Sequence, residues 1–196
     1  MLLLLGVQLL QAQKNTGRLG QYHNFPLVLG VQFHSLSHPF KNLKQNFKNV
    51  GFTLGSEISL GNTPKWAQTF QVGWYQNKAT GNGFMVYTQS VYRPYLVGNV
   101  FGEVKAGFGW LKSARPSAAL KSNNGNWTTV GKAGKGMLMI PAGVSLGYNN
   151  YSNGTYTAPS ISYQVFVSGI YNKSFPVMVN SLLQAQTRVH FNNQKN

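Results

Sequence analysis

The sequence predicts an all-β protein, an eight-stranded antiparallel up-and-down β-barrel that spans a membrane and has a polar lumen filled with side chains. Three observations predict this fold. Residues 183–191 alternate between apolar and polar side chains, which is the period of a β-strand, and weaker alternation recurs in about eight segments. Only 10% of the residues are charged, against about 25% in soluble domains. The two acidic residues, Glu57 and Glu103, both fall on the polar phase.

We expect eight strands. In the clearest internal strand, Val104, Phe108 and Trp110 lie on one face, and Glu103 and Lys105 lie on the other. No 18-residue apolar run follows the N-terminus, so a helical membrane protein is excluded, whereas a barrel gives a much weaker signal in each strand. The predicted strands cover about residues 27–36, 51–60, 66–76, 84–93, 103–110, 137–148, 160–171 and 183–191.

The connections between these strands alternate between short and long. Tight turns are expected near Asn62, Gly98 and Asn153, because glycine and asparagine favour turns. Residues 112–135 are rich in Lys, Asn, Gly and Ser without a sustained period, so we expect a long loop there. Pro141 has no N–H to give to a neighbouring strand, which predicts a β-bulge within residues 137–148.

The composition of the two faces predicts which one points outward. A soluble barrel places Lys and Glu on its outer face, but the polar face here is mostly Gly, Gln, Ser, Thr and Tyr, which suits a crowded lumen. The apolar face carries Trp or Tyr toward several strand ends, as in a lipid-facing belt with aromatic girdles. A soluble ligand-binding barrel with the opposite arrangement remains an alternative.

The N-terminal residues predict export. Residues 1–10 are almost wholly apolar and too short to span a membrane, which is typical of a secretory signal peptide cut near Ala12. We therefore divide the chain into a signal peptide (1–12), a periplasmic segment (13–26), the barrel (27–191) and a short tail (192–196). A buried N-terminal strand or helix is the alternative for residues 1–10. Cysteine is absent, so disulfide and thiolate chemistry are excluded.

The basic charge of the chain lies mainly in the predicted outward loops. The net charge is +15, and basic groups of this kind pair with the phosphates of lipopolysaccharide, although solvated loop charges would give the same pattern. Nucleic acid is disfavoured as a partner because no recognition helix, zinc spacing or aromatic RNA-binding motif accompanies the charge. The basic residues in or beside these loops are Lys41, Lys44, Lys48, Lys78, Lys112, Arg115, Lys121, Lys132, Lys135 and Lys173.

The two glutamates need cationic partners in a lumen of low dielectric constant. If the hairpin before the fifth strand is centred at Gly98, Arg93 lies directly across from Glu103, and Lys105 follows on the same face. Arg188 or His34 is the expected partner of Glu57. We therefore predict a lumen ion-pair cluster of Glu57, Arg93, Glu103, Lys105 and Arg188 that fills and stiffens the barrel.

One group of residues suggests catalysis. His34 and Ser37, with Glu57 as the orienting carboxylate, would make a hydrolase such as a lipid A deacylase, since a Ser–His pair performs acyl transfer. Adjacent strand residues point to opposite faces, however, so the alternative is a lumen histidine beside a polar loop. Residues 131–136 lack the Ser or Thr of a phosphate-binding loop, and the four histidines have no metal spacing. We expect no catalytic residue, metal or cofactor.

These features resemble the small outer-membrane β-barrels of Gram-negative bacteria, the OmpA/OmpX-like class. The resemblance rests on Gln11, Ala12 and Gln13 at the end of the signal, on the eight alternating strands, and on Phe191 as the aromatic assembly signal of the last strand. It implies insertion into the outer membrane by the barrel-assembly machinery. The family includes structural proteins, adhesins and lipid-modifying enzymes. Among these we expect a structural or accessory protein without enzymatic activity, in contact with lipopolysaccharide or another outer-membrane protein.

Overall fold

A computed structural model describes residues 25–35, 47–61, 65–118, 120–123, 126–129, 131–132, 134–152, 155–169 and 177–191. The predicted signal peptide, the tail and the turns near Asn62 and Asn153 lie outside the described residues, as do Ser37, Lys41, Lys44 and Lys173. In the part of the chain that is described, no helix is long and apolar enough to cross a membrane.

The described residues form twelve strands. They are β1 (Leu27–Ser35), β2 (Val50–Ser59), β3 (Trp66–Tyr75), β4 (Gly83–Tyr92), β5 (Tyr95–Val97), β6 (Val100–Ser113), β7 (Leu120–Asn123), β8 (Asn126–Thr129), β9 (Lys135–Tyr148), β10 (Asn150–Ser152), β11 (Thr155–Gly169) and β12 (Val177–Phe191).

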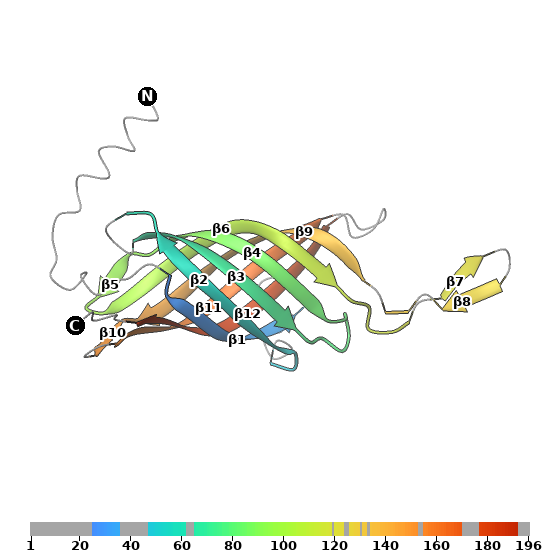
Figure 1. The fold of residues 1–196 in the computed structure, drawn as a ribbon, viewed down its shortest axis with the longest axis horizontal. Helices are drawn as coiled ribbons and strands as arrows, with labels where there is room; N and C mark the ends of the chain where they lie inside the picture. Colours follow the sequence, from blue (N-terminus) through green and yellow to red (C-terminus); the bar gives the residue numbers. More distant parts are fainter. Residues whose placement is uncertain are drawn as a thin grey trace, which may run out of the picture.

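Eight of these strands close into a barrel (Figure 1). β1, β2, β3, β4, β6, β9, β11 and β12 each pair antiparallel with the next, and β12 pairs with β1 to close the ring. The short strands β5 and β10 extend hairpins at the end of the barrel where β1 begins and β12 ends, here called the terminal end. The β7–β8 hairpin projects from the opposite end, the loop end. The predicted up-and-down barrel is confirmed.

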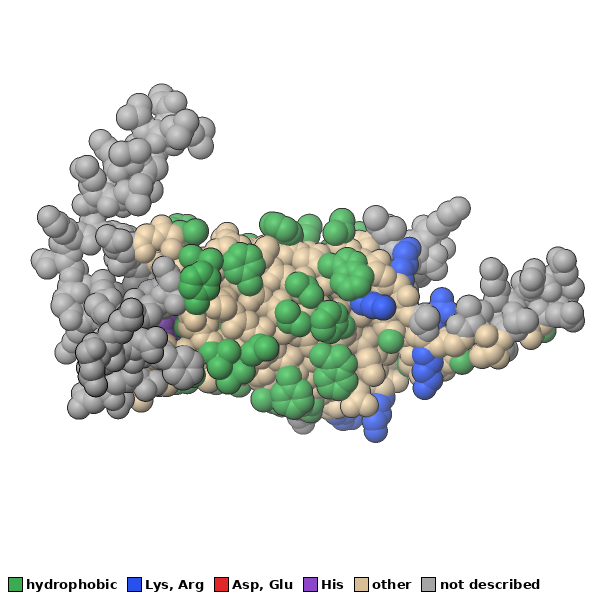
Figure 2. All heavy atoms as spheres, viewed as in Figure 1, with side chains coloured by type: hydrophobic (Ala, Val, Ile, Leu, Met, Phe, Trp, Pro, Cys, Tyr) green, Lys and Arg blue, Asp and Glu red, His purple; other side chains and the backbone are tan. Residues whose placement is uncertain are grey.

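The outer wall is apolar and the inner wall is polar over most of the barrel. Phe108 is 70% exposed on the outside, whereas Gln32, Gln164 and Gln184 are fully buried inside. Apolar side chains gather along the visible face of the barrel in Figure 2. The alternative of a soluble barrel is therefore wrong, because such a barrel would bury its apolar face and leave its polar face in water.

Aromatic pairs on β3 and β4 mark the two edges of this apolar belt. Trp66 pairs with Tyr92 near the terminal end, and Trp74 pairs with Phe84 near the loop end. The two tryptophans are eight positions apart on β3. At roughly 3.3 Å per residue and a tilt of roughly 40°, they are about 20 Å apart along the barrel axis, close to the height of a lipid-facing band.

One outward patch is polar, which the alternation of the strands did not predict. Gln68 on β3 donates a hydrogen bond to Thr88 Oγ1 (2.5 Å) and accepts one from Ser90 Oγ (2.8 Å) on β4. The Thr88 hydroxyl in turn donates to the Thr69 carbonyl (2.9 Å). Because these polar groups satisfy one another, the patch is compatible with a lipid-facing wall.

The expected β-bulge at Pro141 is absent. β6 and β9 keep the same register before and after Pro141, with Ala106 opposite Ala142 and Gly109 opposite Met139, so no extra residue is inserted. Instead the pairing is interrupted between those two positions, while Pro141 stays paired with Phe166 on β11. The missing N–H of proline leaves a gap in one ladder without a shift of register.

The expected loop at residues 112–135 is partly wrong. β6 continues to Ser113, β9 begins at Lys135, and the β7–β8 hairpin lies between them. Each hairpin strand has only four residues, too few to show a period among the surrounding polar residues. The barrel wall therefore extends past the aromatic pair at the loop end.

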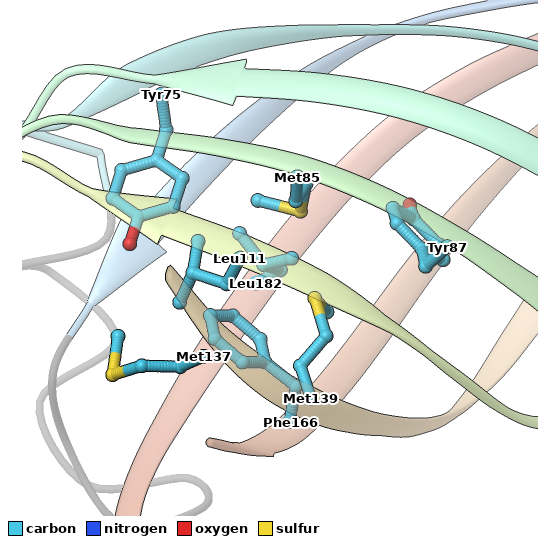
Figure 3. Packing of buried hydrophobic residues seen from close by; sticks show 8 residues of the cluster. All are labelled: Tyr75, Met85, Tyr87, Leu111, Met137, Met139, Phe166 and Leu182. Atoms are coloured by element: carbon cyan, nitrogen blue, oxygen red, sulfur yellow. The ribbon is translucent and has the colours of Figure 1, made fainter. Parts of the chain in front are cut away.

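Part of the lumen is apolar, in addition to the predicted polar lining. A cluster of inward side chains lies in the half of the barrel nearer the loop end, and Figure 3 shows it packed between the strands. The residues are methionines, leucines, tyrosines and a phenylalanine on the same phase as the polar lumen residues. They are Tyr75, Met85, Tyr87, Leu111, Met137, Met139, Phe166 and Leu182.

Candidate functional site

Five charged residues meet inside the barrel near the terminal end, and we call them the charged cluster: Glu57, Arg93, Glu103, Lys105 and Arg188. All five are buried. Glu57 lies on β2, and Arg93 is the residue that follows β4. Glu103 and Lys105 lie on β6, and Arg188 lies on β12. The structure thus brings together every residue that the sequence assigned to the lumen cluster.

A tight hairpin places Arg93 opposite Glu103. Gly98 has a positive φ of 56° between β5 and β6, a conformation that glycine adopts without strain. Tyr92 pairs with Val104, and Tyr95 pairs with Phe101. Arg93 lies between these two pairs and therefore faces Glu103. The turn predicted near Gly98 therefore sets this contact.

Arg93 binds both carboxylates. Its Nη1 and Nη2 donate to Glu57 Oε1 (3.0 Å) and Oε2 (2.6 Å), and its Nε donates to Glu103 Oε1 (2.7 Å). Arg188 Nη1 bridges the same pair, at 3.3 Å from Glu57 Oε2 and 2.7 Å from Glu103 Oε1. Lys105 Nζ lies 3.4 Å from Glu103 Oε2. Each carboxylate thus contacts two arginines, which offsets the cost of burying it.

Phe101 supports the two arginines from within the lumen. The guanidinium carbons of Arg93 and Arg188 lie 5.7 and 4.9 Å from the centre of its ring. The face of an aromatic ring attracts cations at these distances. This residue was not among the expected site residues, although it lies on the inward phase of β6, two positions before Glu103.

Glutamines join the strands across the middle of the lumen. Gln71 Oε1 accepts hydrogen bonds from Tyr87 OH (2.7 Å) and Gln186 Nε2 (3.2 Å). Gln184 Nε2 donates to Gln32 Oε1 (3.0 Å), and Gln164 Nε2 donates to Gln184 Oε1 (2.5 Å). The polar phase of the strands therefore forms a connected network that fills the barrel between the charged cluster and the apolar cluster.

His34 lies away from Glu57, contrary to one expectation for the cluster. The register of Val28 with Gly55 places Glu57 beside the start of β1, whereas His34 lies near the end of that strand. Of the two expected partners, only Arg188 contacts Glu57.

The surroundings of His34 also contradict a catalytic arrangement with Glu57. Its Nδ1 lies 2.9 Å from Asn77 Nδ2 and its Nε2 lies 3.1 Å from Asn180 Oδ1, so a neutral ring accepts from the first and donates to the second. The ring is buried and stacks on Tyr75 with centroids 3.8 Å apart. Ser37, the expected nucleophile, lies outside the described residues.

Exposed basic side chains gather at the loop end, where Figure 2 shows most of the blue atoms. They are Lys48, Lys78, Lys112, Arg115, Lys132 and Lys135. Lys121 lies on β7, and its side chain is not described. The whole chain has only two acidic residues, and both are buried in the lumen, so no carboxylate side chain offsets these charges.

Backbone contacts hold five of these residues in one region, here called the basic patch: Lys78, Lys112, Arg115, Lys132 and Lys135. The Arg115 N–H donates to the Lys132 carbonyl (3.1 Å). The Ala114 N–H donates to Asn82 (2.7 Å), which ties the turn that carries Lys78 to the segment after β6. Lys135 pairs with Ser113 across β6 and β9.

The basic patch borders the apolar belt directly. Lys112 faces outward on β6, opposite Phe84 on β4 and Gly136 on β9. The Trp110 indole lies so close to Gly136 that a Cβ there would be 2.7 Å from its Cζ2. Cations beside aromatic residues at a membrane boundary suit phosphate groups above acyl chains.

No metal centre is evident within the described residues, where no three His, Cys, Asp or Glu side chains come together. Phe191 ends β12, and its side chain is not described. Its role as an assembly signal stays a prediction.

The fold has counterparts among solved structures. It is similar to the crystal structure of Neisserial surface protein A, with 11% sequence identity, a TM-score of 0.55, and coverage of 85% of this chain and 97% of that chain. No protein-family model and no curated protein matches the chain.

Two further structures match with lower TM-scores. The attachment invasion locus protein Ail of Yersinia pestis has 14% identity over 85% of this chain and 97% of that chain, with a TM-score of 0.44. The N-terminal β-barrel domain of Pseudomonas aeruginosa OprF has 12% identity over 82% of this chain and 96% of that chain, with a TM-score of 0.41.

Proposed function

We propose that this outer-membrane β-barrel is a non-enzymatic structural or accessory protein whose basic patch binds the phosphate groups of lipopolysaccharide. The closed barrel and its apolar outer wall support a position in the outer membrane of a Gram-negative bacterium. The observation that carries the proposal is the basic patch, which lies at the edge of the apolar belt.

Two features of the patch favour a phosphate ligand. Arginine and lysine pair strongly with phosphate, and five cations in one region suit a headgroup with more than one phosphate. The adjacent outward residues Phe84 and Trp110 supply an apolar surface for the acyl chains of the same molecule. Contact with lipopolysaccharide through this region accounts for a surface that has cations and no carboxylate side chains.

Removal of the patch charges tests the proposal. We expect the combined variant Lys112→Gln, Arg115→Gln, Lys132→Gln and Lys135→Gln to bind lipid A about tenfold more weakly, since each exposed charge contributes little and four contributions add. The measurement is native mass spectrometry of the purified barrel with lipid A. The matched control is Lys65→Gln, an exposed lysine at the terminal end, which should bind as the unaltered protein does. Equal binding by all three proteins would contradict the proposal.

The absence of enzymatic activity has its own test. The ring nitrogens of His34 are engaged by Asn77 and Asn180, and Glu57 by Arg93, so a Ser–His–Glu arrangement has no support from this geometry. Lipid A mass spectra of cells with and without the protein should show the same acyl pattern. A lost or added acyl chain would replace the proposed function with that of a lipid-modifying enzyme.

Contact with a partner protein is a second candidate function, favoured by the β7–β8 hairpin. This hairpin projects from the loop end (Figure 1), and Trp127 on it is 70% exposed. Exposed aromatic residues of this kind anchor protein interfaces. A photo-crosslinking residue at position 127 should give one adduct of defined mass in intact cells, and the same residue at position 65 should give none.

A further inference from the structure

His34 is a buried side chain near the loop end that takes no part in the charged cluster. It is fully buried and lies between two amides, with its Nδ1 2.9 Å from Asn77 Nδ2 and its Nε2 3.1 Å from Asn180 Oδ1. Its ring also stacks on Tyr75. The histidine therefore connects β1 and β12 to Asn77, which lies just past the end of β3.

Asn77 organises the turn between β3 and β4, residues 77–82, here called the β3–β4 turn. Its Oδ1 accepts hydrogen bonds from the N–H groups of Ala79 (2.9 Å) and Thr80 (3.1 Å). Asn77 is only 3% exposed, so a group inside the barrel anchors the turn. Lys78, an exposed residue of the basic patch, lies in this turn.

The β3–β4 turn also contacts the segment that carries Arg115. The Asn82 carbonyl accepts a hydrogen bond from the Ala114 N–H (2.7 Å). Gly81 has a φ of 94°, and a Cβ there would lie 1.8 Å from the Ala114 carbonyl oxygen, so only glycine allows this close approach. The Arg115 N–H donates to the Lys132 carbonyl (3.1 Å). A continuous path of contacts thus joins the lumen histidine to three cations of the basic patch.

We propose that His34 is a positioning residue for the lipopolysaccharide site. Through Asn77 it holds the β3–β4 turn, and with it Lys78, in the arrangement that binds phosphate. This inference rests on the proposed function of the basic patch. A cation that is held in place before the ligand arrives costs less entropy to order on binding, so a buried residue affects the affinity without reaching the lipid. The role needs an acceptor at Nδ1, because Asn77 Nδ2 can only donate.

Two variants separate the hydrogen bonds of His34 from its packing. Both remove the ring that stacks on Tyr75, but His34→Gln keeps an oxygen that can accept from Asn77 and an amide that can donate to Asn180. We expect His34→Leu to bind lipid A about fivefold more weakly, because Lys78 must then be ordered on binding. His34→Gln should bind as the unaltered protein does.

The measurement is native mass spectrometry of the purified barrel with lipid A. Equal binding by His34→Leu and the unaltered protein would overturn the proposal. Equal losses in His34→Leu and His34→Gln would also overturn it, because the ring would then act through packing alone.

A double-mutant cycle tests whether His34 acts through the turn. Effects of residues that share no partner usually add as free energies, and the lumen histidine and the exposed Lys78 are joined only through Asn77 in the proposed mechanism. We therefore expect His34→Leu to have a smaller effect on lipid A binding in a Lys78→Gln protein than alone. The same fold-loss in both backgrounds would overturn the proposal.

His190→Leu is the matched control, since His190 is a similarly buried lumen histidine near the terminal end. It should leave lipid A binding unchanged. An equal loss of binding in His190→Leu and His34→Leu would indicate general damage to the barrel and would overturn the proposal.

Amide hydrogen exchange measures the turn without any lipid. Ala79 and Thr80 should exchange faster in His34→Leu than in His190→Leu or the unaltered protein, because their acceptor is no longer anchored. Unchanged exchange would show that His34 does not hold the turn and would overturn the inference. Failure of the unaltered protein to bind lipid A is a separate result, and it would overturn the proposed function.

Discussion

A single side chain, Arg93, joins both carboxylates of the charged cluster. It donates two hydrogen bonds to Glu57 and one to Glu103, and all three residues are buried. Replacing one member of a buried ion pair leaves its partner uncompensated, which typically costs about 3–5 kcal/mol. We therefore expect Arg93→Gln to lower the free energy of unfolding by about this amount, measured by urea titration in phospholipid vesicles.

A double-mutant cycle tests whether this loss comes from the pairing. Glu103→Gln alone should also destabilise the barrel, and the double variant with Arg93→Gln should recover part of the summed losses, with a coupling of about 0.5–3 kcal/mol. The surface control Lys48→Gln should stay within about 0.5 kcal/mol of the unaltered protein. Strictly additive losses would show that Arg93 and Glu103 act independently.

The contacts of the cluster could be predicted from the sequence to different degrees. Arg93 and Glu103 are related by a local hairpin, so the position of Gly98 sets their contact. Arg188 contacts Glu57 although the two residues are 131 positions apart in the sequence. This contact could be predicted only because both side chains fall on the inward-facing positions of their strands. The partners of His34 could not be predicted, because Asn77 lies in a turn outside the period of the strands.

Among the elements, β6 and β9 are joined by a pairing that is interrupted in its middle. Their pairing stops between Ala106 and Gly109, where Pro141 has no N–H to donate. Pro141→Ala restores a donor, and a new hydrogen bond contributes about 1 kcal/mol. We expect slower amide hydrogen exchange at residues 107–108 in the variant, measured by mass spectrometry in nanodiscs. Unchanged exchange there, with residues 103–106 as the internal reference, would show that the gap has another cause.

The lengths of the elements show where sequence patterns stop being informative. The eight wall strands were predicted because each must alternate while one face meets lipid and the other meets the lumen. Beyond the belt the outward residues no longer meet lipid and can be polar, so the alternation is lost although pairing continues, as in the first residues of β12 and the last of β6. The apolar cluster at the loop end was missed because Met137 and Met139 share the inward phase with polar residues.

At the scale of the whole molecule, the barrel separates its charges by position. Carboxylates lie only in the lumen, and the exposed cations of the described chain lie mainly at the loop end. The belt between the two aromatic pairs has no exposed charge in its described residues. This arrangement gives each region a different solvent: lipid for the belt, other side chains for the lumen, and water or phosphate for the loop end.

The cost of an arginine on the outer wall should therefore depend on its depth. Phe108 lies opposite Thr88, midway between the Tyr92 and Phe84 positions of β4, so it marks the middle of the belt. We expect Phe108→Arg to lower the free energy of unfolding by about 2–4 kcal/mol in phospholipid vesicles. Val97, equally outward at 78% exposure but at the terminal turn, should tolerate Val97→Arg at a cost of about 0–1 kcal/mol. Equal losses at both positions would mean that lipid does not contact the belt, because only a hydrocarbon surrounding makes the penalty depend on depth.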